Sequence, residues 1–162
     1  MSRAVPERRF SQAPSHLVTD ANPLWGLVFP FASAPATAAP ATGTALTLRT
    51  VGSLGPILVG PNGMTLYMFL SDTTTMSTCS GSCAQNWPPL TTTGSPRAKG
   101  GVSQSLLGTI RRQDGTMQVT YHGHPLYSFI ADSGPGMANG EGLDAFGARW
   151  EVINAAGMAV AR

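Results

Sequence analysis

The feature that most constrains the fold of this chain is a ten-residue segment that occurs twice, 60 residues apart. Gly63–Asp72 aligns with Gly123–Asp132, and Gly, Leu, Tyr, Phe and Asp match at identical spacing. Five identities in ten positions rarely arise by chance, so the match indicates an internal duplication. Trp87 is expected to correspond to Trp150, with three extra residues in the second loop. We therefore expect two related halves that follow one plan.

Short runs rich in β-branched and aromatic residues, bounded by Gly, Pro, Asn or Asp, are typical of strands. The sequence predicts such strands at Leu46–Val51, Ile57–Val59, Thr65–Leu70, Leu107–Arg112, Met117–Tyr121, Leu126–Ala131, Trp150–Ile153 and Met158–Ala161. Turn signals at Pro61-Asn62-Gly63, His122-Gly123 and Asn154–Gly157 predict a β-hairpin in each half and a third near the end. Strands that are apolar on both faces lie inside a sandwich or barrel. The expected fold is all-β, a small sandwich or barrel of two pseudo-symmetric, hairpin-containing halves.

Composition separates an N-terminal arm from this β domain. Residues 1–45 contain six of the 13 prolines and an Ala/Thr-rich stretch, which bury little apolar surface, so a disordered arm is expected. Within the arm, arginines precede the apolar run Leu24–Ala32 and small residues follow it, the order of an export signal. The β domain is expected over 46–162, with repeat 1 at about 50–92, a linker at about 93–104 and repeat 2 at about 105–154.

Charge and hydropathy exclude several kinds of partner. Charged residues make up 11% of the chain, with 10 Lys plus Arg against 8 Asp plus Glu. A chain with so few cations has no dense basic face that could release counterions, so no nucleic-acid partner is expected. No apolar run approaches the roughly 20 residues of a membrane-spanning helix, so no transmembrane span is expected.

The residues shared by the two halves are expected to be structural. They are Tyr67, Phe69, Asp72 and Trp87 in repeat 1 and Tyr127, Phe129, Asp132 and Trp150 in repeat 2. The aromatic rings are predicted to lie in the core. Asp72 and Asp132 each end a strand and enter a Gly/Ser/Thr-rich loop, where a carboxylate can accept backbone N–H bonds and hold the turn. A role as general acid or base is the alternative for them.

Residues present in only one half are better functional candidates. Cys79 and Cys83 occur only in the first half, and Gly81 allows the chain to turn between them. A disulfide is the default for such a pair in an exported protein, provided that the Cα atoms come close enough. A redox-active pair or a soft-metal site is the alternative, although the spacing is not the Cys-x-x-Cys of thioredoxins.

Two further features of the second half could bind metal ions. His122 and His124 could bind copper or zinc with Met137 or Met117 as a soft extra ligand, but two imidazoles on an exposed turn do not make a closed site. Oxygen atoms in the loop Asp132–Asp144 could hold calcium, although the spacing is not that of an EF-hand and a glycine-rich surface loop is the alternative.

The Tyr-x-Phe-x-x-Asp unit, found at Tyr67–Asp72 and Tyr127–Asp132, resembles the bacterial secreted repeat family of unknown function, whose members are often predicted lipoproteins. Cys79–Leu90 is similar to the first repeat of that family and Gln118–Tyr127 to the second, and the likeness covers about residues 50–154. The resemblance implies an extracytoplasmic location and no particular activity. Because no cysteine precedes Cys79, the lipid anchor of the predicted lipoproteins is not expected in this chain.

These features favour an exported, non-catalytic module that binds an envelope or extracellular partner. The chain has no Gly-x-Ser-x-Gly elbow, no His-Glu-x-x-His and no phosphate-cradling loop, which favours a non-enzyme that requires no cofactor. The alternatives are a copper- or calcium-binding protein and a thiol–disulfide redox protein that works through Cys79 and Cys83.

Overall fold

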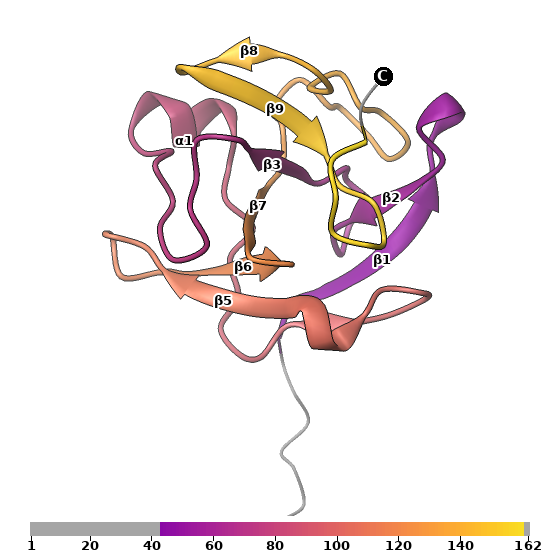
Figure 1. Cartoon of the computed structure of the whole chain (residues 1–162), viewed down its shortest axis with the longest axis horizontal. Helices are drawn as coiled ribbons and strands as arrows, with labels where there is room; N and C mark the ends of the chain where they lie inside the picture. The colour runs from indigo at the N-terminus through magenta and orange to yellow at the C-terminus, as the bar shows by residue number, and fades with distance from the viewer. Residues whose placement is uncertain (1–42, 161–162) are drawn as a thin grey trace, which may run out of the picture. The chain divides into compact units, whose positions relative to one another are not determined.

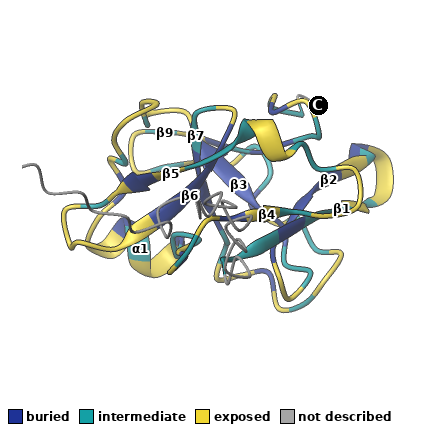
Figure 2. Cartoon of the chain, turned by 90° about the horizontal axis from the view of Figure 1, so that it is seen from below, coloured by how far each residue is buried: buried dark blue, intermediate teal, exposed yellow. Residues whose placement is uncertain are grey.

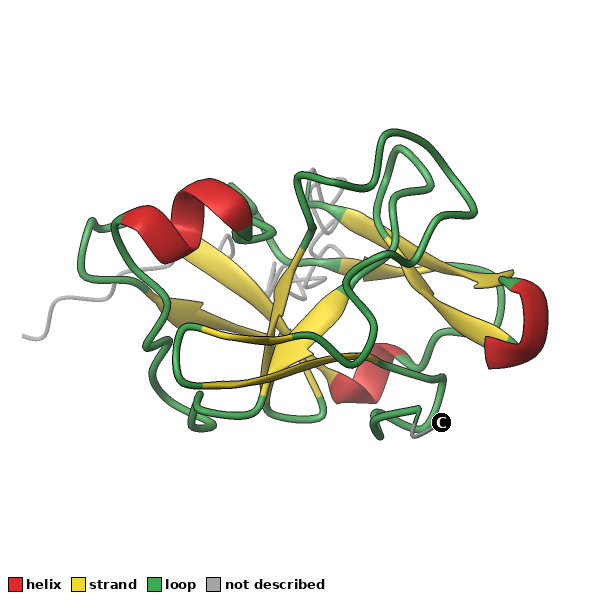
Figure 3. Ribbon diagram, turned by 90° about the horizontal axis from the view of Figure 1, so that it is seen from above, coloured by secondary structure: helices red, strands yellow, loops and turns green. Residues whose placement is uncertain are grey.

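The computed structural model describes residues 43–160, which form two β-sheets (Figures 1 and 3). A three-stranded sheet has the order β2-β1-β4, and a six-stranded sheet has the order β5-β6-β7-β3-β9-β8. The larger sheet has open edges at β5 and β8, so the described strands pack as sheets and do not close a barrel. The fold is all-β, as the sequence predicts. The export signal and most of the arm predicted over residues 1–45 lie outside the described residues.

The elements are short and are joined by turns. The strands are β1 (Ala45–Thr50), β2 (Pro56–Val59), β3 (Tyr67–Phe69), β4 (Arg97–Ala98), β5 (Leu107–Arg111), β6 (Met117–Tyr121), β7 (His124–Tyr127), β8 (Asp144–Ala145) and β9 (Ala148–Val152). In the described part of the chain, one α-helix, α1, covers Ser82–Asn86, and two 3-10 turns, η2 and η3, cover Gly52–Leu54 and Gln104–Leu106.

The two copies of the duplicated segment lie side by side at the centre of the larger sheet. Strand β3 of repeat 1 pairs antiparallel with β7 of repeat 2, with Tyr67 opposite Tyr127. On its other edge β3 pairs with β9, where Phe69 lies opposite Trp150. Because equivalent residues meet in this central pair, the two halves are related by an approximate two-fold axis between β3 and β7.

Each half also supplies a segment to the other half. The amide of Leu70 donates to the carbonyl of Arg149, the residue before the tryptophan of repeat 2, over 3.0 Å. The amide of Ile130 donates over the same distance to the carbonyl of Asn86, the residue before the tryptophan of repeat 1. The halves are therefore interlocked through exchanged tryptophan segments and are not simply stacked.

The central strands are buried on both faces, as Figure 2 shows. Tyr67 and Phe69 face a cluster built on aromatic rings, whereas Met68 faces a mainly aliphatic cluster that includes residues of both sheets. This alternation matches the strand pattern in the sequence. Two apolar residues near the ends of the predicted strand runs are exceptions, because Leu70 and Ile130 are 49% and 65% exposed.

Several strand boundaries differ from the prediction: the run Thr65–Leu70 is reduced to β3, and the two-residue strands β4 and β8 have no counterpart in the prediction. The run Leu126–Ala131 continues as β7 only to Tyr127, because the amide of Ser128 donates to the carbonyl of Pro88 in the exchanged segment. The predicted strand Met158–Ala161 is reduced among described residues to a single bridge between Ile153 and Ala159. The turn before it is present, since the amide of Gly157 donates to the carbonyl of Asn154. The hairpin at His122-Gly123 is also present, with positive φ at both turn residues.

Candidate functional site

The repeated tyrosines and aspartates bond across the two halves. The hydroxyl of Tyr67 donates to Oδ2 of Asp132 over 2.6 Å, and the hydroxyl of Tyr127 donates to Oδ2 of Asp72 over 2.5 Å. Sequence reasoning placed these residues in the core and at the turns, but it did not indicate that each tyrosine is bonded to the aspartate of the other repeat. The five-residue spacing of Tyr and Asp within one copy carries no signal for this exchange.

The remaining oxygen of each carboxylate holds the loop that follows it. Oδ1 of Asp132 accepts the amide of Asn139 over 2.9 Å. Oδ1 of Asp72 accepts both the amide and the hydroxyl of Thr78, over 2.7 and 2.8 Å. Both oxygens of each carboxylate therefore have donors from the protein, which is the arrangement of a turn-holding residue.

The loops also close over the phenol oxygens, by different means in the two halves. The amide of Gly140 donates to the Tyr67 hydroxyl over 3.2 Å. In the other half the Ser77 hydroxyl shares a 2.5 Å hydrogen bond with the Tyr127 hydroxyl. Gly140 has no room for a side chain, because a Cβ atom there would lie 2.5 Å from Cη2 of Trp87.

Burial makes the two phenols poor acids. Burial raises the pKa of Tyr67 well above its usual value and is the largest cause of the shift. The hydrogen bond to Asp132 raises that pKa further. Burial and the bond to Asp72 raise the pKa of Tyr127 in the same way. Both hydroxyls stay protonated at neutral pH, so they serve as hydrogen-bond donors and not as bases.

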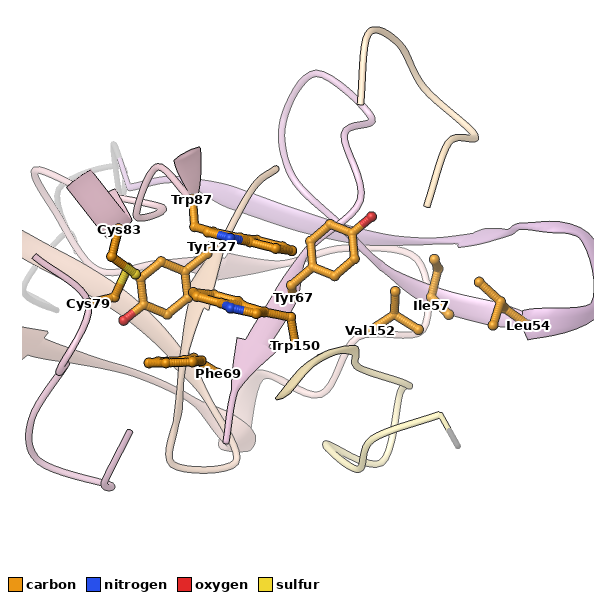
Figure 4. Packing of buried hydrophobic residues seen from close by; sticks show 10 residues of the cluster. All are labelled: Leu54, Ile57, Tyr67, Phe69, Cys79, Cys83, Trp87, Tyr127, Trp150 and Val152. Atoms are coloured by element: carbon orange, nitrogen blue, oxygen red, sulfur yellow. A yellow bond between two sulfur atoms is a disulfide. The ribbon is translucent and has the colours of Figure 1, made fainter. Parts of the chain in front are cut away.

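Four aromatic rings from alternating repeats form a stack, and Figure 4 shows three of them, those of Phe69, Trp150 and Trp87. The indoles of Trp87 and Trp150 lie 3.9 Å apart between centroids and 3° from parallel. Phe69 stacks on the outer face of Trp150 and Phe129 on that of Trp87, with centroids 4.2 and 4.0 Å apart. The rings of Tyr67 and Tyr127 meet Trp87 and Trp150 edge-on, at 81° and 87°. The repeated aromatic residues thus form one shared core.

A disulfide joins Cys79 to Cys83, with their Cα atoms 5.2 Å apart. Both residues are buried members of the aromatic cluster, which Figure 4 draws together with their disulfide. The bridge spans the turn at Gly81, where φ is +57°, and leads into α1. It braces the loop that carries Ser77 and Trp87.

The histidines lie in the β6–β7 hairpin, with their ring centroids 6.3 Å apart. Burial is the largest cause that lowers the pKa of His124, and the neighbouring His122 lowers it further. Met137, the suggested third ligand, is engaged with other residues, since its carbonyl accepts from Thr65 and its sulfur from Ser133. Among the described residues, no group of three or more His, Cys, Asp or Glu side chains is placed to hold a metal ion.

The loop suggested for calcium uses its carboxylates within the protein. Asp132 accepts hydrogen bonds from Tyr67 and Asn139, and Glu141 accepts the amide of Val152 over 2.6 Å. Asp144 lies in β8. The carboxylate oxygens of Asp132 and Glu141 thus act as acceptors for other parts of the protein.

Sequence reasoning missed Arg112, which organises the first loop. Its side chain is only 7% exposed. Nη1 donates to the Ser77 hydroxyl and the Gln118 side chain over 2.8 and 2.7 Å, and Nη2 donates to the carbonyl of Cys79 over 2.7 Å. An arginine at the end of a predicted strand is ordinarily solvated, so the sequence held no signal for its burial.

A cavity of about 580 Å³ opens above this arginine. One wall is the loop that contains the disulfide, with Met76, Thr78, Ser80 and Ala84 among its residues, and the other is the β5–β6 turn at Gln113 and Asp114. The cavity lies at a loop that the other repeat does not reproduce, since only repeat 1 contains cysteines.

Comparison with known families also divides the chain into two repeats. The model of a family described as a secreted repeat of unknown function matches residues 49–91 and 108–154, more than half of the chain. The chain belongs to this family. Each matched segment of the secreted repeat contains one Tyr…Asp unit and the tryptophan that follows it. No curated protein and no solved structure matches the chain significantly. Within residues 43–160, no helix has the length and hydropathy needed to cross a bilayer.

Proposed function

We propose that this secreted-repeat protein is a non-catalytic binding module that works outside the cytoplasm, at the cell envelope or in the extracellular space. The observation that carries the proposal is the reciprocal bonding of Tyr67 with Asp132 and of Tyr127 with Asp72. The side chains that would be the best candidates for acid–base chemistry are the same side chains that join the halves.

The geometry of these groups argues against catalysis. A general base must present a free lone pair to its substrate. Both oxygens of Asp72 and Asp132 accept hydrogen bonds from the protein, and Asp132 is buried. The phenols are also buried, and the pKa values of Tyr67 and Tyr127 are raised by that burial. The hydrogen bonds of these groups lie within the protein, which supports a structural role for them over a catalytic one.

The burial of the disulfide supports a bracing role over thiol exchange. Exchange requires a thiolate to reach one of the sulfur atoms along the S–S axis. Cys79 is fully buried and Cys83 nearly so, within the aromatic cluster. An attacking thiol would have to open that cluster first.

The proposal is tested by assays for turnover with the purified protein. We expect no hydrolysis of ester, phosphate, glycoside or peptide substrates and no catalysis of insulin reduction by dithiothreitol. Turnover that is lost in Asp132→Asn, in a variant whose near-ultraviolet circular dichroism shows a native aromatic core, would reject the proposal. Export is tested separately, by finding the protein in the extracytoplasmic fraction of its own cells.

A further inference from the structure

We propose that the cavity above Arg112 binds the carboxylate group of a small organic ligand. This inference deepens the proposed function, on which it rests, because it assigns a ligand class to a module for which only binding has been argued. It is carried by a nearly buried guanidinium that borders the cavity, by a counter-charge that lies 3.9 Å away on a largely exposed side chain, and by the chemistry of the cavity walls.

The guanidinium of Arg112 is held rigidly and is only partly used. Its Nη atoms make three hydrogen bonds, to Ser77, Gln118 and the carbonyl of Cys79. All three acceptors are neutral. Nε–H is buried and has no acceptor among the described residues. A buried polar group without a partner destabilises the fold, more so when it is charged, and native proteins contain few of them.

The charge of Arg112 is also poorly balanced. The nearest carboxylate oxygen recorded for it, Oδ2 of Asp114, lies 3.9 Å from Nε, beyond hydrogen-bond distance. Oδ1 of Asp114 accepts the amide and hydroxyl of Thr116, and these bonds are the main cause that lowers the pKa of Asp114. The Asp114 side chain is 60% exposed, so water screens its interaction with the buried cation. A buried cation of this kind favours an anion that can make direct, charge-assisted hydrogen bonds.

The cavity walls fit a small ligand with one charged end. The volume of about 580 Å³ lies in the range of sites for small molecules. The side chains of Ser80 and Gln113 offer further donors at the rim, while Met76 and Ala84 supply apolar surface. A carboxylate at Arg112 would leave the body of the ligand between these polar and apolar walls.

The negative charge of Asp114 favours singly charged over doubly charged anions in the cavity. Arginine pairs equally well with carboxylate and phosphate in geometry. A carboxylate at the rim of the cavity repels a dianion about twice as strongly as a monoanion at the same distance. The position of Asp114 therefore selects a carboxylate over a phosphate, and it lowers the affinity for either.

The test uses the ¹⁵N–H signals of the arginine Nε groups in the full-length protein. Isobutyrate is titrated at neutral pH, with isobutyramide as the uncharged isostere and inorganic phosphate as the other oxyanion. Arg111 supplies the matched control, because it precedes Arg112 and is exposed, and Arg111→Gln assigns its signal by removing it. Arg112 itself is left intact because it holds the first loop.

We expect isobutyrate to shift the Arg112 Nε–H signal saturably, isobutyramide to leave it unmoved, and the Arg111 signal to stay in place. Asp114→Asn keeps the Oδ1 acceptor for Thr116 and should tighten isobutyrate binding about three- to tenfold by removing the rim charge. No saturable shift up to about 100 mM isobutyrate, where even millimolar affinity would saturate the site, overturns the proposal. An equal response to isobutyramide, tighter binding of phosphate, or weaker binding in Asp114→Asn also overturns it. If isobutyrate does not bind and the enzyme assays show no turnover, only the carboxylate-binding proposal is rejected. Turnover in those assays would reject the proposed non-catalytic function.

Discussion

The hydroxyl of Tyr67 lies 2.6 Å from Oδ2 of Asp132, a carboxylate supplied by the other copy of the duplicated segment. Tyr127 makes the matching bond to Asp72. Each repeat therefore contains a donor and an acceptor that find their partners only in the other repeat. A repeat unit of this kind cannot satisfy its own polar groups or bury its own rings, so the duplication is a requirement of the fold.

Removal of single hydroxyls should destabilise the protein in a defined order. Tyr67→Phe should lower the free energy of unfolding by about 2–3 kcal/mol, because it takes a donor from the buried Asp132. Tyr127→Phe should cost about 1–2 kcal/mol, since Asp72 is only half-buried. The matched control is Tyr121→Phe, whose hydroxyl donates to the backbone carbonyl of Ala155, and it should cost about 1 kcal/mol. Urea unfolding measures all three, and a Tyr121 effect as large as that of Tyr67 would contradict the assignment.

Alkaline pH should weaken the fold through the same two phenols. Below the ordinary tyrosine pKa of 10.0 they are protonated in both folded and unfolded chains, so their stabilisation is fully present. Above it the unfolded chain loses protons that the folded chain retains, because burial raises the folded-state pKa of Tyr67 and Tyr127. Each phenol then lowers stability by up to about 1.4 kcal/mol per pH unit. The free energy of unfolding, measured from pH 7 to 12, should show this fall. In Tyr67→Phe the free energy should fall less steeply with pH. An unchanged slope in that variant would contradict the assignment of Tyr67 as a buried, protonated phenol.

Gly140 should tolerate no side chain. In Gly140→Ala the new Cβ would lie 2.5 Å from the Trp87 ring and 3.0 Å from the Tyr67 ring, so we expect a loss of about 1–3 kcal/mol from overpacking. Gly134→Ala is the control, because nothing lies within 4 Å of its added Cβ, and its effect should be below about 1 kcal/mol in either direction. Thermal unfolding compares the two, and equal melting temperatures would refute the close approach of Gly140 to the rings.

The disulfide should contribute modestly to stability and resist mild reduction in the folded protein. The disulfide restricts the unfolded chain, and because its loop is short this restriction stabilises the folded protein by only about 2 kcal/mol. The double substitution Cys79→Ser/Cys83→Ser should remove that stabilisation. Burial should protect the sulfurs until the protein unfolds. Alkylation and mass measurement after mild dithiothreitol, with and without urea, test this, and rapid reduction without urea would revive the redox alternative.

The repeat and its strand pattern predicted the fold class because both depend on local information. The alternation around Tyr67 and Phe69 fixed which side chains face the core, and the turn at His122-Gly123 fixed the β6–β7 hairpin. The exchange of partners between repeats could not be predicted, because a motif repeated identically contains no information on which copy each residue bonds to. The exposure of Leu70 and Ile130 follows from that exchange, since the chain there leaves the central pair to meet the other tryptophan segment.

The candidate site was less predictable than the fold. The cysteine pair could be identified in the sequence because its two cysteines lie in one short segment, with a glycine between them that allows the chain to turn. Arg112 was not, because its burial depends on three neutral acceptors, and two of them, Ser77 and the carbonyl of Cys79, lie more than 30 residues away in the sequence. Sequence spacing indicates a site only when its residues lie in one local element, and this cavity is shared between a loop and a hairpin.

The most direct test of the interlocked repeats is a set of double-mutant cycles on the free energy of unfolding, with Tyr→Phe and Asp→Asn substitutions. The account predicts a coupling of at least about 1 kcal/mol between Tyr67 and Asp132 and between Tyr127 and Asp72, which bond across the repeats. It predicts coupling below about 0.5 kcal/mol between Tyr67 and Asp72, which share one copy of the motif. Strong coupling within a copy and none across the copies would contradict it.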